Sequence, residues 1–127
     1  MKNEREFTTQ FTKWLKAFKN ESMAFEVKVV RGKSLPFNAV KDHQRDALYA
    51  TKHNKVVWKI PDDGRQKPFD GFILANVPSF VVIYFISNGN KKFYMVDIDE
   101  WISYSRESQR KSITEEGLQA IGTICHL

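Results

Sequence analysis

Apolar positions recur at helical spacing near the start of the chain and at strand spacing through its middle. In residues 4–19 they fall on one side of a helix, in a stripe that consists of Phe7, Phe11, Trp14, Leu15 and Phe18. A second helix is predicted for residues 38–53, with Asn38 as its N-cap. A third helix begins at the capping-box sequence of residues 112–115 and ends near Gly122, and a short helical turn is expected at residues 100–104.

Several segments rich in β-branched and aromatic residues are predicted as strands, and they span residues 24–30, 56–60, 69–75, 80–87 and 93–98. The segment 80–87 is apolar on both faces, which predicts a central strand. The order of helices and strands predicts an α/β fold in which a mixed β-sheet is flanked by helices. We expect the strand of Glu26 inside this sheet and the helix of Gln44 packed on one of its faces.

Length and composition predict one globular domain over residues 1–127, with 42% hydrophobic and 28% charged residues. Cys125 is the single cysteine, which fits a reducing compartment, and the N-terminus is too charged for a signal peptide. The longest apolar run, residues 80–86, is far shorter than the roughly 20 residues of a membrane helix. We therefore expect a cytoplasmic protein that binds no membrane. The net charge of +5 favours a polyanionic partner such as nucleic acid.

Glu26 and Lys28 place a carboxylate and an ammonium group on the same face of the strand 24–30. Side chains alternate along a strand, so these two share their face with Ala24 and Val30. Charge on an otherwise apolar strand is costly unless it is paired or has a function. The pair is therefore either a simple salt bridge or part of a site.

Two further polar residues interrupt apolar patterns. Gln44 lies on the inward side of the second helix, together with Val40, Leu48 and Thr51. Its amide can point back at the strand of Glu26 and hold a water or a phosphate. Asp70 lies at the start of an apolar strand, and with Glu26 it provides the pair of carboxylates that a hard Mg²⁺ ion requires.

Three short motifs then follow one another in a recognisable order: Ala24-Phe-Glu-Val-Lys28, the loop Ser34-Leu-Pro-Phe37, and His43-Gln44 in the next helix. Together they resemble the PD-(D/E)xK nuclease superfamily, and most of all its Holliday junction resolvases from phages and bacteria. In that branch a Phe-Glu-x-Lys strand, a Phe-Pro-type loop and a Gln-bearing helix come in this order. The segment 79–85 is similar to the core strand of that branch, so the resemblance covers roughly residues 20–100.

The resemblance implies a restriction-endonuclease-like sheet and a Mg²⁺-dependent endonuclease, with Mn²⁺ as a substitute, that cuts DNA and in particular branched DNA. The family's first acidic ligand, the Asp of its Pro-Asp element, usually precedes the Glu-x-Lys strand, and no Asp precedes Glu26 here. We interpret Pro68-Phe69-Asp70 as its relocated equivalent. Glu6, with Glu4 in reserve, is the candidate for the Glu that the family often carries on its first helix.

The resemblance and the residue pattern together predict a division of roles. Glu26 and Asp70 bind the metal ion with the help of the Val27 carbonyl, Lys28 acts on the water or the transition state, and Gln44 positions water or phosphate. The candidate phosphate contacts are the cations that flank this site in the sequence, namely Lys13, Lys16, Arg31, Lys33, Lys41 and Arg45. We expect a homodimer, because a four-way junction needs two symmetric cuts, and an origin in a phage or mobile element.

Two other interpretations stay open. The domain can keep the nuclease fold and only bind DNA or a protein, which the absence of an upstream Asp favours. Alternatively, it is an unrelated α/β adaptor domain in which Glu26 and Lys28 form a salt bridge. Outside the motifs, most aromatic residues fit core stripes, Trp58 among them, and the acidic residues Asp97, Asp99 and Glu100 are typical of a turn. The three histidines, His43, His53 and His126, lack metal-ligand spacing.

Overall fold

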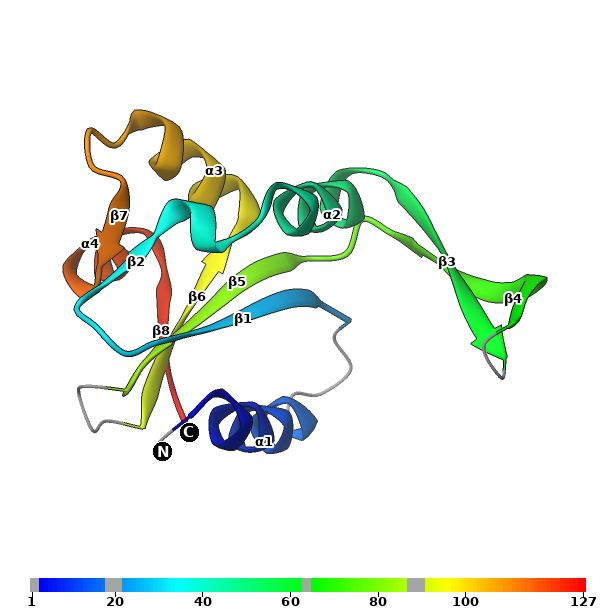
Figure 1. Cartoon of the computed structure of the whole chain (residues 1–127), viewed down its shortest axis with the longest axis horizontal. Coiled ribbons are helices and arrows are strands. Elements are labelled where there is room, and N and C mark those ends of the chain that lie inside the picture. The colour runs from blue at the N-terminus through cyan, green and yellow to red at the C-terminus, as the bar shows by residue number, and fades with distance from the viewer. Residues whose placement is uncertain (1–2, 18–21, 63–64, 87–90) are drawn as a thin grey trace.

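A four-stranded sheet with the strand order β1-β5-β6-β8 forms the centre of the structure (Figure 1). The computed structural model describes residues 3–17, 22–62, 65–86 and 91–127, and the side chains of residues 61–70 lie outside this description. The helices are α1 (Glu4–Lys16), α2 (Asp42–His53), α3 (Ile98–Glu107) and α4 (Glu115–Ile121), with a 3-10 helix η1 (Phe37–Ala39). The strands are β1 (Ala24–Val30), β2 (Ser34–Pro36), β3 (Lys55–Asp62), β4 (Arg65–Ala75), β5 (Ser79–Phe85), β6 (Lys92–Asp97), β7 (Ser112–Thr114) and β8 (Thr123–His126).

The central sheet is mixed, which confirms the predicted α/β class. β1 runs parallel to β5, with Glu26 opposite Val81, whereas β5 with β6 and β6 with β8 are antiparallel. β5 lies between β1 and β6, as its two apolar faces predicted, and Val81, Val82 and Ile83 are fully buried. The strand of Glu26 belongs to this sheet, as predicted, and β1 forms its edge.

Helices cover both faces of this sheet (Figure 1). On one face α1 contributes Phe7 and Phe11 to a core, the α1-side core, that also contains Tyr84 and Phe93. On the other face Leu48 of α2, Trp101 of α3 and Leu118 of α4 pack against Val81 and Ile83 in the α2-side core. The alternation of apolar side chains along β5 and β6 divides them between these two cores.

The ends of several helices differ from the prediction. Residues 37–39 form η1, so α2 begins at Asp42, and Lys41 rather than Asn38 is its N-cap residue. The last helix begins at Glu115 because residues 112–114 pair with β2, and the hydroxyl of Thr114 accepts the Gly117 amide at its N-terminus. The expected helical turn at 100–104 is the three-turn helix α3. The short strands β2, β7 and β8 were not predicted, because three or four residues show little periodicity.

Strands β3 and β4 form a hairpin of their own, which projects away from the central sheet (Figure 1). Their pairing has an irregularity, since between the pairs Lys59–Gly71 and Pro61–Gln66 β3 advances by two residues and β4 by five. β4 thus carries three extra residues at this bulge, just before Gly71. A Cβ atom on Gly71 would lie 2.4 Å from the carbonyl oxygen of Trp58, so glycine allows the strands to pair closely beside the bulge.

We expect Phe7→Ala to test the packing of α1 on the sheet. The Phe7 side chain is fully buried, and its ring stacks on Tyr84 with a centroid distance of 4.7 Å. Its loss leaves a cavity and should lower the free energy of unfolding by about 3–5 kcal/mol. Chemical denaturation measures this, with the exposed Thr8→Ala on the same helix as the control. An equal, small effect of both changes would contradict the docking of α1.

Candidate functional site

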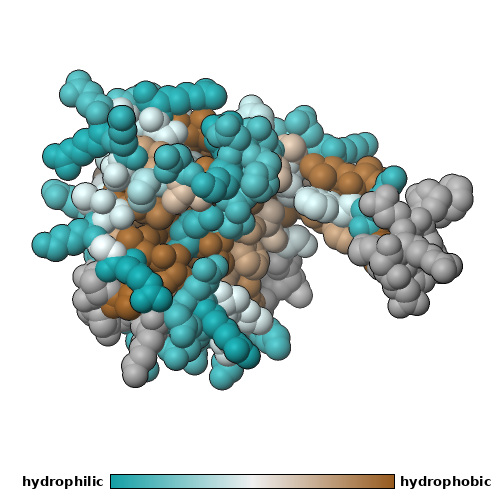
Figure 2. Space-filling view, viewed as in Figure 1, coloured by the Kyte–Doolittle hydropathy of each residue, from teal (hydrophilic) through white to brown (hydrophobic). Residues whose placement is uncertain are grey.

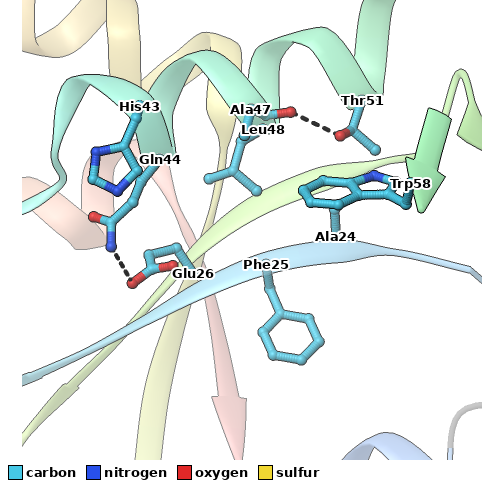
Figure 3. A pocket seen from close by; sticks show the side chains of 9 residues that line it. All are labelled: Ala24, Phe25, Glu26, His43, Gln44, Ala47, Leu48, Thr51 and Trp58. Carbon is cyan, nitrogen blue, oxygen red and sulfur yellow. Dashed lines mark hydrogen bonds between the residues drawn. The ribbon is translucent and has the colours of Figure 1, made fainter. Parts of the chain in front are cut away.

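Glu26 and Gln44 meet on the face of β1 that is turned toward α2 (Figure 3), and Lys28 contacts Glu26 on the same strand face. The Nε2 atom of Gln44 donates a hydrogen bond to Oε1 of Glu26 at 3.0 Å, and Nζ of Lys28 lies 3.3 Å from the same oxygen. The side chains of Lys28 and Glu26 are 20% and 29% exposed, so both are partly shielded and still reachable. The predicted approach of the Gln44 amide to the Glu-x-Lys strand is thereby confirmed.

The Gln44 amide is fixed at both of its ends. Its Oε1 atom accepts the backbone N–H of Lys41 at 2.9 Å, which satisfies one of the groups at the start of α2. Since the carbonyl end accepts from Lys41, the NH₂ end is directed at Glu26. The first turn of α2 is therefore tied to β1 through one side chain, which holds the Glu26 carboxylate in a defined orientation.

A pocket of about 250 Å³ opens beside this cluster, between β1, α2 and the base of the β3–β4 hairpin (Figure 3). Glu26 and Gln44 line one end of it, and Trp58 of β3 lines the other. Trp58 is 45% exposed, which corrects its assignment to the core. The complete lining is Ala24, Phe25, Glu26, His43, Gln44, Ala47, Leu48, Thr51 and Trp58.

The donor set determines which ion this cluster could hold. Glu26 supplies a carboxylate, which suits a hard cation such as Mg²⁺, but such an ion usually takes further oxygen ligands. In the part of the chain that the structure describes, no group of three or more His, Cys, Asp or Glu side chains is arranged to hold a metal ion. The described residues thus fit a metal ion only as one half of a site, and Asp70 is the predicted other half.

Asp70 lies on β4 within the extra residues of the bulge, directly before Gly71. Its side chain is outside the described residues, so its approach to Glu26 stays a prediction. The hairpin that carries it also carries Trp58, which reaches the same pocket as Glu26. Bulges of this kind are common beside active sites, where they redirect a side chain.

Two other predicted site residues are placed differently with respect to the cluster. Val27 lies between Glu26 and Lys28 on β1, and its side chain packs into the α1-side core. The role of its carbonyl as a ligand stays a prediction. Glu6, like the reserve candidate Glu4, lies on α1, which covers the opposite face of the sheet from the Glu26 side chain, so the structure does not bring it to the cluster.

The candidate phosphate contacts fall into two groups. Lys13 and Lys16 lie on α1 and are separated from Glu26 by the sheet. Arg31 and Lys33 follow β1 directly and are exposed, and so is Lys41 at the start of α2. Arg45 also lies on α2, but it is engaged locally with Asp42 at 3.3 Å and with Asp46 at 3.2 Å. Arg31, Lys33 and Lys41 are therefore the best placed of the set.

A network of charged groups joins α2 and α3, and the sequence pattern did not predict it. Nζ of Lys52 lies 2.8 Å from a carboxylate oxygen of Asp97 and also contacts Asp99, and Nε2 of His53 lies 2.9 Å from Asp99. The cations end one helix and the carboxylates begin another, as helix dipoles favour. The acidic cluster interpreted as a turn therefore joins the two helices, and Asp97 caps α3 by accepting the Asp99 amide.

These contacts shift the ionisation of both partners. The hydrogen bonds that Lys52 donates to Asp97 and then Asp99 raise the pKa of Lys52 above its ordinary value. The hydrogen bond from Lys52 holds the pKa of Asp99 below its usual value of 3.8. Each shift means that the folded state favours the charged form of the group.

No protein-family model matches this chain, and no curated protein matches its sequence significantly. Within the described residues, no helix combines the length and the apolar character needed to cross a membrane. The candidate site therefore depends on the motifs and on the geometry described above.

We expect Lys52→Met to destabilise the protein in a pH-dependent way. The lowered pKa of Asp99 contributes stability that is complete above its unfolded value of about 3.8 and is lost as pH falls through the folded value. The difference in unfolding free energy between wild type and Lys52→Met should therefore be present at pH 7 and shrink below about pH 4. Denaturant titrations at several pH values measure it. Lys55→Met, an exposed lysine at the start of β3, serves as the control, and a difference independent of pH would contradict the network.

Proposed function

We propose that this protein is a Mg²⁺-dependent DNA endonuclease of the resolvase-like kind. The observation that supports it is the cluster of Glu26, Lys28 and Gln44, held together by contacts of 3.0 and 3.3 Å beside an open pocket. The edge strand β1, which pairs in parallel with β5, and the helix α2 present these groups on one face of the sheet. Their arrangement agrees with the order of motifs that resembles the PD-(D/E)xK nucleases.

Each residue has a role that its position permits. Glu26 and Asp70, with the Val27 carbonyl, would hold the Mg²⁺ ion, and Mn²⁺ could take its place. When bound, the ion would activate a water and neutralise phosphate oxygens. Lys28 stabilises the negative charge that develops on the phosphate, because its ammonium group lies on the same strand face as Glu26. Gln44 keeps the Glu26 carboxylate oriented through its bond to Oε1.

The charge of the surface around this cluster suits a DNA backbone. Exposed Arg31 and Lys33 follow the end of β1, exposed Lys41 precedes α2, and the whole chain has a net charge of +5. A homodimer would place two such sites on one branched DNA, as paired cuts in opposite strands require. Light scattering with and without a four-way junction tests this assembly.

Variants of the cluster separate cleavage from binding. We expect Glu26→Gln, Lys28→Met and Asp70→Asn to lower the rate of DNA cleavage in Mg²⁺ by at least about 10²–10³-fold, the usual effect of losing one transition-state contact. Binding to the same DNA in Ca²⁺ should be largely kept. Glu107→Gln, an exposed change on α3, is the control and should cleave like wild type.

Two outcomes of this experiment would change the assignment. If Asp70→Asn cleaves like wild type, the relocated-Asp interpretation is wrong and another carboxylate completes the site. If the wild type cuts no branched, duplex or single-stranded DNA in Mg²⁺ or Mn²⁺, the binding-only alternative becomes the better interpretation. The adaptor-domain alternative has its own support, because Glu26 Oε1 already contacts both Lys28 and Gln44, as in a purely structural ion pair.

The affinity for DNA should depend steeply on salt. Each phosphate that a lysine or arginine neutralises adds about 0.9 to the slope of log affinity against log salt. We expect Lys41→Gln to reduce this slope, whereas Lys16→Gln, on α1 across the sheet, should reduce it less. Filter binding at several salt concentrations measures the slopes, and salt-independent binding would contradict a nucleic-acid partner.

A further inference from the structure

The pocket beside Glu26 has a feature that phosphodiester cleavage alone does not need, namely an apolar middle. Ala24 of β1 and Ala47 and Leu48 of α2 lie between the Glu26–Gln44 cluster and the indole of Trp58 (Figure 3). A phosphate and its metal ion would occupy the polar end. The remaining part of the 250 Å³ has walls suited to a flat apolar group.

The polar groups of the lining are mostly engaged within the protein. The hydroxyl of Thr51 donates to the carbonyl of Ala47 at 2.7 Å, and both ends of the Gln44 amide are bonded. A ligand recognised through many hydrogen bonds, such as a sugar, would find few partners here. A ring that binds through its face needs none of them, so the lining favours an aromatic ligand.

Trp58 lies at the end of the pocket where an aromatic ring of a ligand could stack on its indole. It lies near the base of the projecting hairpin, opposite Phe72 in the register, and is 45% exposed. Figure 2 shows apolar side chains gathered on this hairpin where it projects from the rest of the molecule. Lys41, which precedes α2, is exposed, so the helix that borders the pocket begins beside a positive charge. An exposed aromatic face on a positively charged chain is the combination that binds unpaired nucleic acid.

We propose that this pocket receives one unpaired nucleobase, stacked on Trp58, while the phosphate next to it lies against Glu26 and Lys28. The proposal rests on the proposed nuclease function and narrows its substrate to DNA with unpaired nucleotides beside the cut. The bases of an intact duplex are already paired and stacked, and they cannot enter without being flipped out. Because every base has a stacking face, recognition by this pocket does not depend on sequence.

Binding experiments in Ca²⁺, where no cleavage interferes, test the pocket. Wild type, Trp58→Ala, Trp58→Phe and Val57→Ala are titrated with single-stranded, branched and duplex DNA that carries 2-aminopurine at one position at a time. Val57 neighbours Trp58 on the hairpin, is 66% exposed and points to the other face, so its change is the matched control. Thermal unfolding of each variant checks that the fold is intact.

Trp58→Ala should weaken binding to single-stranded and branched DNA by roughly 5- to 140-fold, the equivalent of one lost base stack, and leave the affinity for duplex unchanged. Trp58→Phe should retain most of the affinity, and Val57→Ala all of it. The quenching of 2-aminopurine at an unpaired position should depend on the indole. Equal losses of affinity for duplex and unpaired DNA, or no loss of affinity at all, would contradict the proposed base pocket.

The result is independent of the outcome for catalysis. If Trp58→Ala binds unpaired DNA like wild type while Glu26→Gln abolishes cleavage, the proposed nuclease function is supported and the proposed base pocket is contradicted. If no DNA is ever cut but unpaired DNA binds through Trp58, the proposed base pocket is supported and the proposed nuclease function is contradicted. A wild type that binds no DNA overturns both.

Discussion

The parallel pairing of β1 with β5 is the constraint on which the rest of the structure depends. Two parallel neighbours cannot be joined by a tight turn, so the chain must leave the end of β1 and return to the start of β5 by a long connection. That connection contains α2 and the β3–β4 hairpin. Glu26, Gln44 and Trp58 therefore lie on β1 or on the segment that its pairing with β5 forces to cross over, and the pocket forms where these pieces meet.

The part of the site that the sequence predicted follows from local periodicity. Strand alternation placed Glu26 beside Lys28, and helical spacing placed Gln44 on the inward side of its helix; both placements agree with the observed contacts. The central position of β5 was predicted for the same reason, since a strand that is apolar on both faces must be covered on both. In each case the information lies within about one turn or one strand of chain.

The features that the sequence did not predict depend on which segments, far apart in the chain, pack or pair with each other. Strand patterns alone do not say that β3 and β4 pair only with each other, or that β1 ends the sheet. The exposure of Trp58 follows from that separate hairpin, because an indole in a covered strand would have been buried. Likewise, Lys52 and Asp97 are 45 residues apart, and only the packing of α2 beside α3 brings them together.

The position of β1 at the edge of the sheet has a consequence for solubility. An open strand edge can recruit strands of other chains and start aggregation, and charged side chains on such a strand oppose this. Glu26 and Lys28 are the two charges of β1, and the other five residues of the strand are apolar. Replacing both by aliphatic residues would leave an unbroken apolar edge. We therefore expect the pair that is proposed for chemistry to oppose edge-to-edge polymerisation of the chain as well.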